Sequence, residues 1–444
     1  MKNFVTITKK INNYKKQIHI PSDKSLSIRW ALLAAQAIGR SKAYNLLDSE
    51  DVNSCLNAIK KLGIKVIKKK KITEIISNGL NSFSFKKNTI INANNSGTTA
   101  RLICGMLVKS KKSIILKGDK SLSKRDFSRV IKPLNLFGVN IESKKGRLPL
   151  IINGTNFLRP IYKYKELIGS AQVKSCIMLA ALNTPLNSIT QIYARPSRDH
   201  TERLFKYLKI PIKIKKQKNF ELIEIKGGHQ YKSFTTKISG DISSSSFLIL
   251  LTLLSKNSEI IIKNVNINKT RTGIIDLLKM MNAKITIINK KKNSGEEIGD
   301  IYVKSTKKLR AIRPNPSINS RAIDELPLIF LACAKAKGIS YFKNLGELRH
   351  KEQDRLKFSV KFLKMCGIKV IQNLDCLKIY GEPNLNLQGN YVVKNFMKDH
   401  RAFMMSCVAA LTLGGKWKIY DQDSIKTSFP NYIKLLKFLG AKIK

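Results

Sequence analysis

Acidic residues are scarce in this chain of 444 residues. Asp and Glu number 29 against 83 Lys and Arg, which gives a net charge of +54, and there are only 5 His and 2 Trp. No run of about 18 uncharged apolar residues occurs, so we expect no transmembrane helix. The N-terminal stretch also lacks the long apolar segment that a secretory signal needs. With 43% hydrophobic residues, the sequence predicts a globular cytoplasmic protein.

Cysteines are few and scattered, which excludes two further classes of protein. The seven cysteines form no C-x-x-C pair, and their number is odd. A disulfide scaffold and a zinc site are therefore both poor explanations, and a reducing compartment fits this pattern. We expect no metal site and no membrane partner.

The excess of basic residues has two explanations. Nucleic-acid binding is one of them. The other is the codon bias of an AT-rich genome, because Lys, Asn and Ile are abundant everywhere, including the lysine runs at 68–71 and 290–292. No aromatic-interleaved basic patch accompanies the charge, so we favour codon bias and expect no nucleic-acid partner. Whatever its origin, the charge attracts small anions.

An internal repeat decides the predicted architecture. One element is an amphipathic helix that turns into a short β-rich run, as in CLNAIKKLGIKVI and VKFLKMCGIKVI. The six turns lie 71 to 85 residues apart, at Gly63, Gly138, Pro211, Asn282, Gly367 and Gly440. Gly or Asn there supplies a left-handed helix cap, whereas proline cannot continue a helix. A second element with the same rhythm is a buried helix of small and apolar residues that begins with polar ones.

Six such units are too many for one hydrophobic core. We therefore predict an α/β fold of two domains with three units each, one spanning 22–238 and the other 1–21 plus 239–444. The first 20 residues contain two strand-like runs, and the N-terminal segment would complete the last unit. Chain crossings near 20–22 and 238–241 would then form a hinge.

Polar residues at the starts of the buried helices predict an anion site. Helix N-termini carry unpaired N–H groups and about half a positive charge, and Ser, Thr, Asp and Asn cap them. Capping suffices for the serine run 243–246. It does not explain Lys24, Arg101 and Arg401, cations that oppose the dipole unless an anion lies between. Six such ends around one cleft would bind a ligand with several phosphates or carboxylates.

Acidic side chains near these motifs allow two interpretations. Asp324 and Glu325 open the fifth buried helix, and Glu352 lies among Arg349, Lys351 and Arg355. A carboxylate in a cationic cleft stays ionised and can take or relay a proton. A solvated salt-bridge network at a helix start accounts for the spacing equally well.

The motifs together resemble a known family, the 5-enolpyruvylshikimate-3-phosphate synthases, almost from end to end. The segments that carry the resemblance are Pro21–Arg29, Asn95–Arg101, Gly169–Ser175, Ser197–Glu202, Asp324–Pro327, Leu348–Arg355 and Asp399–Arg401. The resemblance implies an enolpyruvyl transferase-like fold with six βαβαββ-type units. It also implies a transferase of the shikimate pathway, which leads to chorismate and aromatic amino acids.

The implied reaction moves the enolpyruvyl group of phosphoenolpyruvate to the 5-hydroxyl of shikimate 3-phosphate and releases phosphate. It would run by addition and elimination in a closed interdomain cleft, without metal or organic cofactor. Both substrates are small anions, as the helix starts require, and we expect a monomer.

The resemblance also implies roles for individual residues. Shikimate 3-phosphate would be bound by Lys24, Ser25, Arg29, Ser170, Gln172, Arg198, Asp324 and Lys351. Phosphoenolpyruvate would be bound by Lys24, Gly97, Arg125, Gln172, Arg355 and Arg401. Asp324 would accept the hydroxyl proton, Glu352 would be a proton-transfer partner, and Lys24 would touch both substrates. Arginine suits these sites because its planar fork binds carboxylate and phosphate through two bonds.

Two alternatives remain. UDP-N-acetylglucosamine enolpyruvyl transferase shares the fold, but that family usually has Lys-Asn where Lys24-Ser25 stands. It also has a cysteine on the loop ahead of Arg125, whereas this chain has LKGDKSLSKRD there. The second alternative is an RNA-binding or RNA-end-processing protein on a related repeat fold, which would bind RNA with a steep salt dependence.

Overall fold

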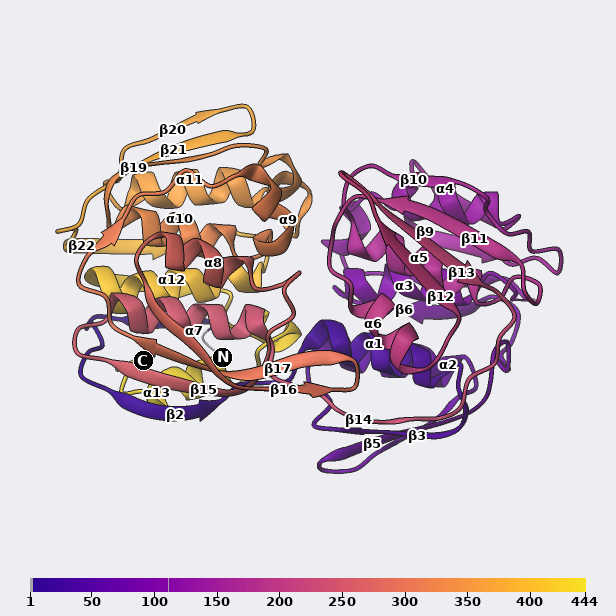
Figure 1. The fold of residues 1–444 in the computed structure, drawn as a ribbon. Coiled ribbons are helices and arrows are strands. Elements are labelled where there is room, and N and C mark those ends of the chain that lie inside the picture. The colour runs from indigo at the N-terminus through magenta and orange to yellow at the C-terminus, as the bar shows by residue number, and fades with distance from the viewer. Residues whose placement is uncertain (1–2, 111) are drawn as a thin grey trace. The chain divides into compact units, whose positions relative to one another are not determined.

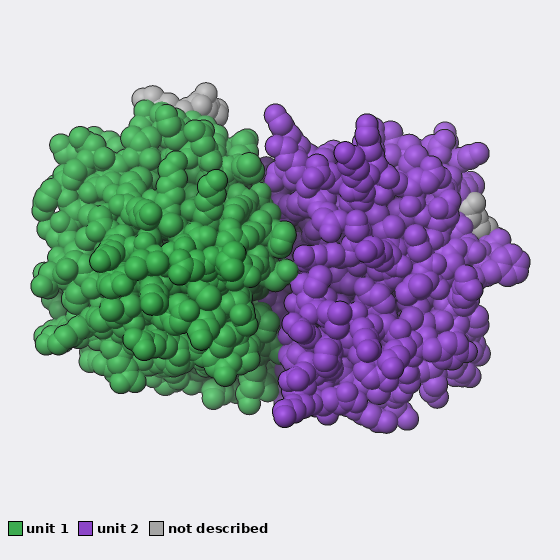
Figure 2. All heavy atoms as spheres, turned by 90° about the horizontal axis from the view of Figure 1, so that it is seen from above, with its two compact units in different colours: residues 1–21, 239–291, 297–444 green, residues 22–238, 292–296 purple. Residues whose placement is uncertain are grey.

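The structure, a computed structural model, describes residues 3–110 and 112–444 and divides them into two compact units. Unit 1 holds the residues up to Pro21 together with 239–291 and 297–444, and unit 2 holds 22–238 together with 292–296. Figure 2 colours unit 1 green and unit 2 purple. Whether the crossings between them act as a hinge stays a prediction.

Unit 2 contains three four-stranded sheets. Their strands, in spatial order, are β14 (Thr235–Lys237), β3 (Ile38–Tyr44), β5 (Ile72–Asn78) and β4 (Lys65–Lys68); β6 (Thr89–Asn92), β7 (Ile114–Lys117), β9 (Arg147–Asn153) and β8 (Asn140–Lys144); and β10 (Tyr164–Glu166), β11 (Ile189–Ala194), β13 (Glu221–Lys226) and β12 (Ile212–Lys216). In each sheet the first two strands are parallel and the other neighbours are antiparallel.

Unit 1 contains three sheets of related order. Their strands are β2 (Lys15–His19), β15 (Glu259–Asn266), β17 (Glu296–Lys304) and β16 (Lys284–Asn293); β18 (Leu309–Arg310), β19 (Ala336–Phe342), β21 (Cys376–Gly381) and β20 (Val370–Asn373); and β22 (Leu387–Val393), β23 (Gly414–Tyr420) and β1 (Phe4–Ile7). The third sheet continues through an antiparallel bridge between Ile7 and Ile443. The N-terminal strand therefore shares a sheet with the last strands of unit 1, the arrangement on which the predicted closure depends.

Each repeat has one inner and one outer helix. The inner helices are α1 (Lys24–Ala34), α3 (Gly97–Met106) and α5 (Ala171–Ala181) in unit 2, and α7 (Ile242–Leu254), α10 (Leu326–Ala334) and α12 (His400–Leu413) in unit 1. The outer ones are α2 (Glu50–Lys61), α4 (Ser128–Leu136), α6 (His200–Tyr207), α8 (Gly273–Met280), α11 (Arg355–Met365) and α13 (Tyr432–Phe438). Short helical segments are α9 (Asn319–Ala322), η1 (Leu122–Lys124), η2 (Pro316–Ile318), η3 (Gly346–His350) and η4 (Gln422–Thr427). The order strand, inner helix, strand, outer helix and two strands confirms the βαβαββ prediction.

The inner helices form the centre of each unit because most of their residues are buried. All nine residues of α10 are buried, and α7, α10 and α12 contact one another. Figure 1 draws these three helices in rose, orange and yellow. A helix that is hydrophobic all round is stable only inside a core. In unit 2, α3 contacts both α1 and α5. The inner helices thus hold their polar first turns in fixed positions.

The turns after the outer helices have the predicted left-handed backbone in five of the six repeats. The residues with positive φ are Gly63, Gly138, Asn282, Gly367 and Gly440. In the third repeat the left-handed residue is Lys209, with φ 57°, two residues before Pro211. The prediction that Pro211 marks this turn is therefore wrong by two positions, because proline has a fixed negative φ and cannot be the left-handed residue.

One segment differs from the predicted domain division. Residues 292–296, at the turn between β16 and β17, belong to unit 2 and not with the rest of 239–444. The reason is a set of polar contacts: His200 Nδ1 lies 2.7 Å from Glu296 Oε1, with both side chains buried, and Asn293 Nδ2 donates to the Lys237 carbonyl at 2.6 Å.

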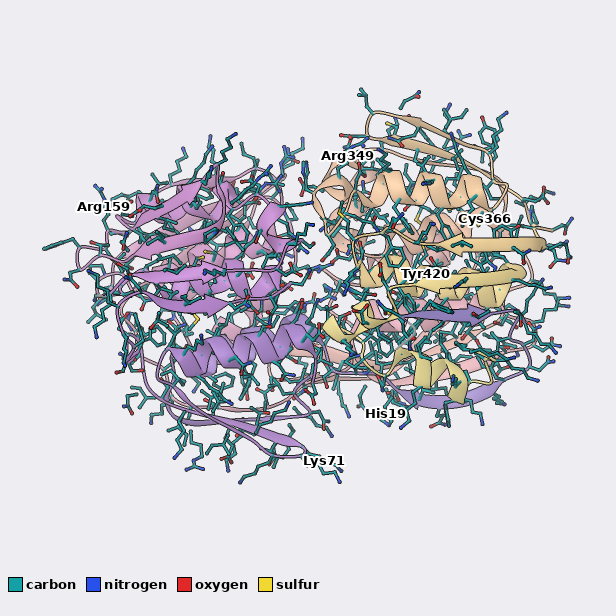
Figure 3. The ribbon with its side chains drawn as sticks, turned by 180° about the vertical axis from the view of Figure 1, so that it is seen from behind. His19, Lys71, Arg159, Arg349, Cys366 and Tyr420 are labelled. Carbon is teal, nitrogen blue, oxygen red and sulfur yellow. The ribbon has the colours of Figure 1, made fainter. Side chains whose placement is uncertain are left out.

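The lysine runs lie on exposed turns and strand ends. Every residue of 68–71 and 290–292 is exposed, and Figure 3 places Lys71 at the tip of the hairpin formed by β4 and β5. No helix within residues 3–110 and 112–444 has the length and apolar character needed to cross a membrane. All seven cysteines are unpaired.

A buried ion pair joins α5 to α6 in unit 2. Lys174 Nζ lies 2.5 Å from Glu202 Oε1, and neither side chain is more than 3% exposed. Glu221 Oε2 is a further 4.0 Å neighbour of the same ammonium. Removing one member of such a pair leaves the other charge buried without compensation.

We therefore expect Lys174→Ala to lower the free energy of unfolding by about 3–5 kcal/mol. Lys206→Ala on the exposed face of α6 is the matched control and should change it by less than about 0.5 kcal/mol. Urea unfolding of the full chain, followed by circular dichroism, measures both. Equal unfolding midpoints for the two variants would show that the buried pair is not a stabilising contact.

Candidate functional site

Lys24 begins the first inner helix of unit 2 with its charge already paired. Asp23 caps α1 by accepting from the Leu26 N–H at 2.8 Å, so the chain turns into the helix directly before Lys24. Lys24 Nζ donates to Asp51 Oδ2 at 2.8 Å, and Asp51 lies in the first turn of α2. Thr99 Oγ1 donates to the Asp51 carbonyl at 3.5 Å, which joins this group to the start of α3.

Arg29 lies one turn further along α1 and is 5% exposed. Its Nε donates to Thr201 Oγ1 at 2.9 Å, one Nη to Ser175 Oγ at 3.0 Å, and the other Nη to a carbonyl. That carbonyl belongs to Ser25, the residue after Lys24. These three contacts to oxygen atoms fix the orientation of the guanidinium.

Two further guanidinium groups gather at the first turn of α3. A Cβ added to Gly97 would lie 2.9 Å from Arg125 Nη1 and 3.0 Å from Arg101 Nη1. Arg125 Nη2 donates to Asn95 Oδ1 at 2.9 Å, and Arg101 lies over the Phe127 ring at 4.9 Å. Only glycine fits against both arginines without displacing them. Two cations beside a helix N-terminus form a binding site for a phosphate or carboxylate.

Gln172 connects α5 to this cationic group. Its Oε1 accepts from Arg101 Nη1 at 3.0 Å, and its Nε2 donates to Thr98 Oγ1 at 3.0 Å. Ser170 caps α5 by accepting from the Val173 N–H at 3.4 Å. The starts of α3 and α5 are thus held together by side-chain hydrogen bonds.

Glu166 organises the loop in front of α5. Its carboxylate accepts the main-chain N–H groups of residues 168–170 at 2.7–3.2 Å and is 3% exposed. Burial raises the pKa of this carboxyl, although the three N–H groups oppose the rise. Arg198, half-buried in the loop that leads into α6, completes the predicted residues of unit 2.

Arg355 is the centre of the cluster in unit 1. It is 2% exposed and donates through Nε to Asp399 Oδ2 at 2.8 Å, through Nη2 to Glu352 Oε2 at 2.5 Å, and through Nη1 to Asp324 Oδ1 at 3.1 Å. Burial disfavours the charged form, but the three carboxylates outweigh it and raise the pKa of Arg355 above its ordinary value. The guanidinium is therefore a permanent, fixed cation.

Asp324 lies among three cations. Besides Arg355, Lys351 Nζ is 3.5 Å from its Oδ1 and Arg401 Nη2 is 3.8 Å from its Oδ2. Asp399 caps α12 and accepts from the Arg401 N–H at 2.9 Å, which fixes the backbone of that arginine. A carboxylate is a group that can accept a proton from a hydroxyl group within hydrogen-bonding distance.

The structure therefore brings the predicted residues together within each unit. Unit 2 holds Lys24, Ser25, Arg29, Gly97, Arg125, Ser170, Gln172 and Arg198, and unit 1 holds Asp324, Lys351, Glu352, Arg355 and Arg401. Sequence reasoning missed Asp51 and Glu166. Asp51 lies in the first turn of a helix that a serine caps, a position where acidic residues are common for structural reasons alone. Glu166 lies outside every motif.

The fold and these clusters define a class of protein, the enolpyruvyl transferases. The enolpyruvyl transferase NikO from Streptomyces tendae superposes with a TM-score of 0.77 over 99% of this chain and 98% of its own, at 14% identity, a similarity that concerns the fold alone. An EPSP synthase from Acinetobacter baumannii superposes with a TM-score of 0.85 at 31% identity, over 99% of both chains.

Sequence comparison leads to one family within this class. The family model described as EPSP synthase (3-phosphoshikimate 1-carboxyvinyltransferase) matches residues 8–436. The 3-phosphoshikimate 1-carboxyvinyltransferase of Ruthia magnifica subsp. Calyptogena magnifica is 37% identical over 98% of both sequences. That of Petrotoga mobilis is 37% identical over 98% of this chain and 99% of its own. The chain belongs to the EPSP synthase family.

Proposed function

We propose that this enzyme transfers the enolpyruvyl group of phosphoenolpyruvate to the 5-hydroxyl of shikimate 3-phosphate. The products are 5-enolpyruvylshikimate 3-phosphate and phosphate, on the route to chorismate and aromatic amino acids. The observation that carries this proposal is the convergence of Lys351, Arg355 and Arg401 on Asp324, in a chain that belongs to this family over its whole length. Full-length relatives at 37% identity share this activity in their names, so neither alternative is favoured.

The cations of the two units supply what the substrates need. In unit 2, we assign Ser25, Arg29, Ser170, Gln172 and Arg198 to shikimate 3-phosphate, and Gly97 and Arg125 to phosphoenolpyruvate. Lys24 would contact both substrates and Gln172 would bridge them. In unit 1, we assign Lys351 and Asp324 to shikimate 3-phosphate, and Arg355 and Arg401 to phosphoenolpyruvate. Fixed guanidinium groups bind phosphate and carboxylate without reorganisation.

The proton transfers follow from the carboxylates of unit 1. Asp324 would remove the proton of the 5-hydroxyl group while the oxygen of that hydroxyl attacks C2 of phosphoenolpyruvate. Glu352 would deliver a proton to the methylene carbon. In the tetrahedral intermediate the bond from C2 to the phosphate oxygen then breaks. A methyl proton returns to a carboxylate, the new C=C bond forms and phosphate leaves. Acid and base exchange roles between the two steps.

Location and assembly are part of the same proposal. Seven unpaired cysteines, six of them buried, fit a reducing cytoplasm. We also propose that the chain acts as a monomer.

Phosphate release tests the reaction directly. Purified enzyme should release phosphate only when phosphoenolpyruvate and shikimate 3-phosphate are both present. Phosphate and 5-enolpyruvylshikimate 3-phosphate should form in equal amounts. Replacing shikimate 3-phosphate by UDP-N-acetylglucosamine is the control for the related transfer. Turnover of the sugar nucleotide, or of neither acceptor, would refute the proposed function.

Arg125→Ala should weaken phosphoenolpyruvate binding. Losing one charged contact in a partly desolvated site costs about 2 kcal/mol, a rise of about 30-fold in KM for phosphoenolpyruvate. Lys124→Ala, the exposed neighbour, should leave this KM within about two-fold. Steady-state kinetics with varied phosphoenolpyruvate provide the measurement, and equal KM values in the two variants would remove Arg125 from the site.

Asp324→Ala should lower kcat much more than it weakens substrate binding. General base catalysis contributes about 10²–10⁴-fold, so a loss in this range is expected. Asp375→Asn, an exposed carboxylate of the same unit, is the control and should retain normal turnover. Near-normal kcat in Asp324→Ala, with unfolding unchanged, would mean that another group is the base.

A further inference from the structure

A chain of buried polar contacts lies behind Arg401 in unit 1. Glu325, the residue after Asp324, is fully buried and precedes α10 without capping it. Its Oε1 accepts from Arg401 Nη1 at 3.2 Å and from Ser243 Oγ at 2.5 Å. The proposed reaction gives this carboxylate no role.

The contacts continue to a second buried arginine. Arg271, 2% exposed, donates through Nη2 to Ser243 Oγ at 2.7 Å and to Asp241 Oδ1 at 3.2 Å. Asp241 in turn caps α7 by accepting from the Ser243 N–H at 2.8 Å. The Ser243 hydroxyl therefore accepts from one guanidinium and donates to Glu325, so its orientation is determined on both sides.

The buried Glu325 carboxylate is stabilised by its contacts with these neighbours. Its Oε2 makes no hydrogen bond among the described residues, so Oε1 carries both of its contacts. A buried carboxylate is tolerated only when it is paired with a cation and hydrogen-bonded. Arg401 supplies that cation directly, and Arg271 acts through Ser243.

The distances show which carboxylate holds Arg401. Arg401 Nη1 lies 3.2 Å from Glu325 Oε1 and 3.2 Å from the Asp324 main-chain carbonyl, whereas the Asp324 carboxylate is 3.8 Å from Nη2. The guanidinium thus makes hydrogen bonds to Glu325 and to the backbone, and only a longer ion pair to the side chain of Asp324.

We propose that Glu325 is a positioning residue for Arg401. It draws the guanidinium into one orientation, ready for the carboxylate or phosphate of phosphoenolpyruvate, and leaves the Asp324 carboxylate available for the proton. Ser243 and Arg271 hold Glu325 in place. This inference rests on the proposed function, because it assigns Arg401 to phosphoenolpyruvate.

The test compares Glu325→Gln with Ser246→Ala. Ser246 lies buried on the same helix as Ser243, but its hydroxyl donates to the Ser243 main-chain carbonyl and stays outside the contacts of Glu325. We expect Glu325→Gln to raise KM for phosphoenolpyruvate by about ten-fold or more, since the amide oxygen of glutamine can still accept from Arg401 but lacks the negative charge that strengthens this hydrogen bond. KM for shikimate 3-phosphate should stay within about two- to three-fold, and Ser246→Ala should match the wild type within about two-fold.

Two further variants separate positioning from a structural effect. Glu325→Asp keeps the negative charge and should recover part of the loss. Ser243→Ala leaves the contact between Glu325 and Arg401 in place but removes the hydroxyl that links Glu325 to Arg271, so it should raise KM for phosphoenolpyruvate by a smaller factor. It serves as the test variant if Glu325→Gln does not fold. Unchanged KM for phosphoenolpyruvate, or an equal rise in KM for both substrates, would overturn the inference.

Equilibrium dialysis with labelled phosphoenolpyruvate keeps the two proposals distinguishable. If the wild type binds phosphoenolpyruvate but transfers nothing to shikimate 3-phosphate, the proposed function fails, while weaker binding in Glu325→Gln still supports the positioning role. If the wild type turns over and Glu325→Gln binds phosphoenolpyruvate as tightly as the wild type, the positioning role fails and the proposed function stands.

Discussion

A cation at the start of a helix is opposed by the helix dipole, and both clusters of this protein depend on balancing that repulsion. Lys24 begins α1, Arg355 begins α11 and Arg401 lies in the first turn of α12. Each has a carboxylate partner, which lowers the energy of the charge while no substrate is bound. In the proposed function a substrate anion would take over these contacts, with the cations already oriented by their carboxylate partners.

About a third of the scarce acidic residues lie in the interior. Ten of the 29 Asp and Glu are buried, namely Asp23, Asp51, Glu74, Glu166, Glu202, Asp241, Glu296, Asp300, Glu325 and Asp399. Of the far more numerous basic residues that the structure describes, only Arg29, Lys174, Arg271 and Arg355 are buried. The net charge therefore comes from exposed side chains, as codon bias would produce, whereas the interior keeps pairs of opposite charge.

The repeat explains why functional side chains collect at equivalent places. In every repeat the inner helix leads into a strand that is parallel to the first strand of its sheet, so the polar first turn of that helix lies at an equivalent point of the topology. Two of these first strands come from distant parts of the sequence: β14 pairs with β3, and β2 pairs with β15. In each unit, one sheet is therefore completed by a strand from the end of a chain segment that belongs to that unit, β14 in unit 2 and β2 in unit 1.

The sequence alone determined the repeat, the inner helices and most of the predicted site, because helix periodicity, caps and turns are encoded within a few neighbouring residues. Lys24, Asp324 and Arg355 could be found because each lies in a local motif. Tertiary structure alone decided that Asp51 pairs with Lys24, that Glu296 joins His200 across 96 residues of sequence, and that Glu325 holds Arg401. Such pairs depend on how distant helix starts pack together, and the energy of a buried charge is set by that packing and not by neighbours in sequence.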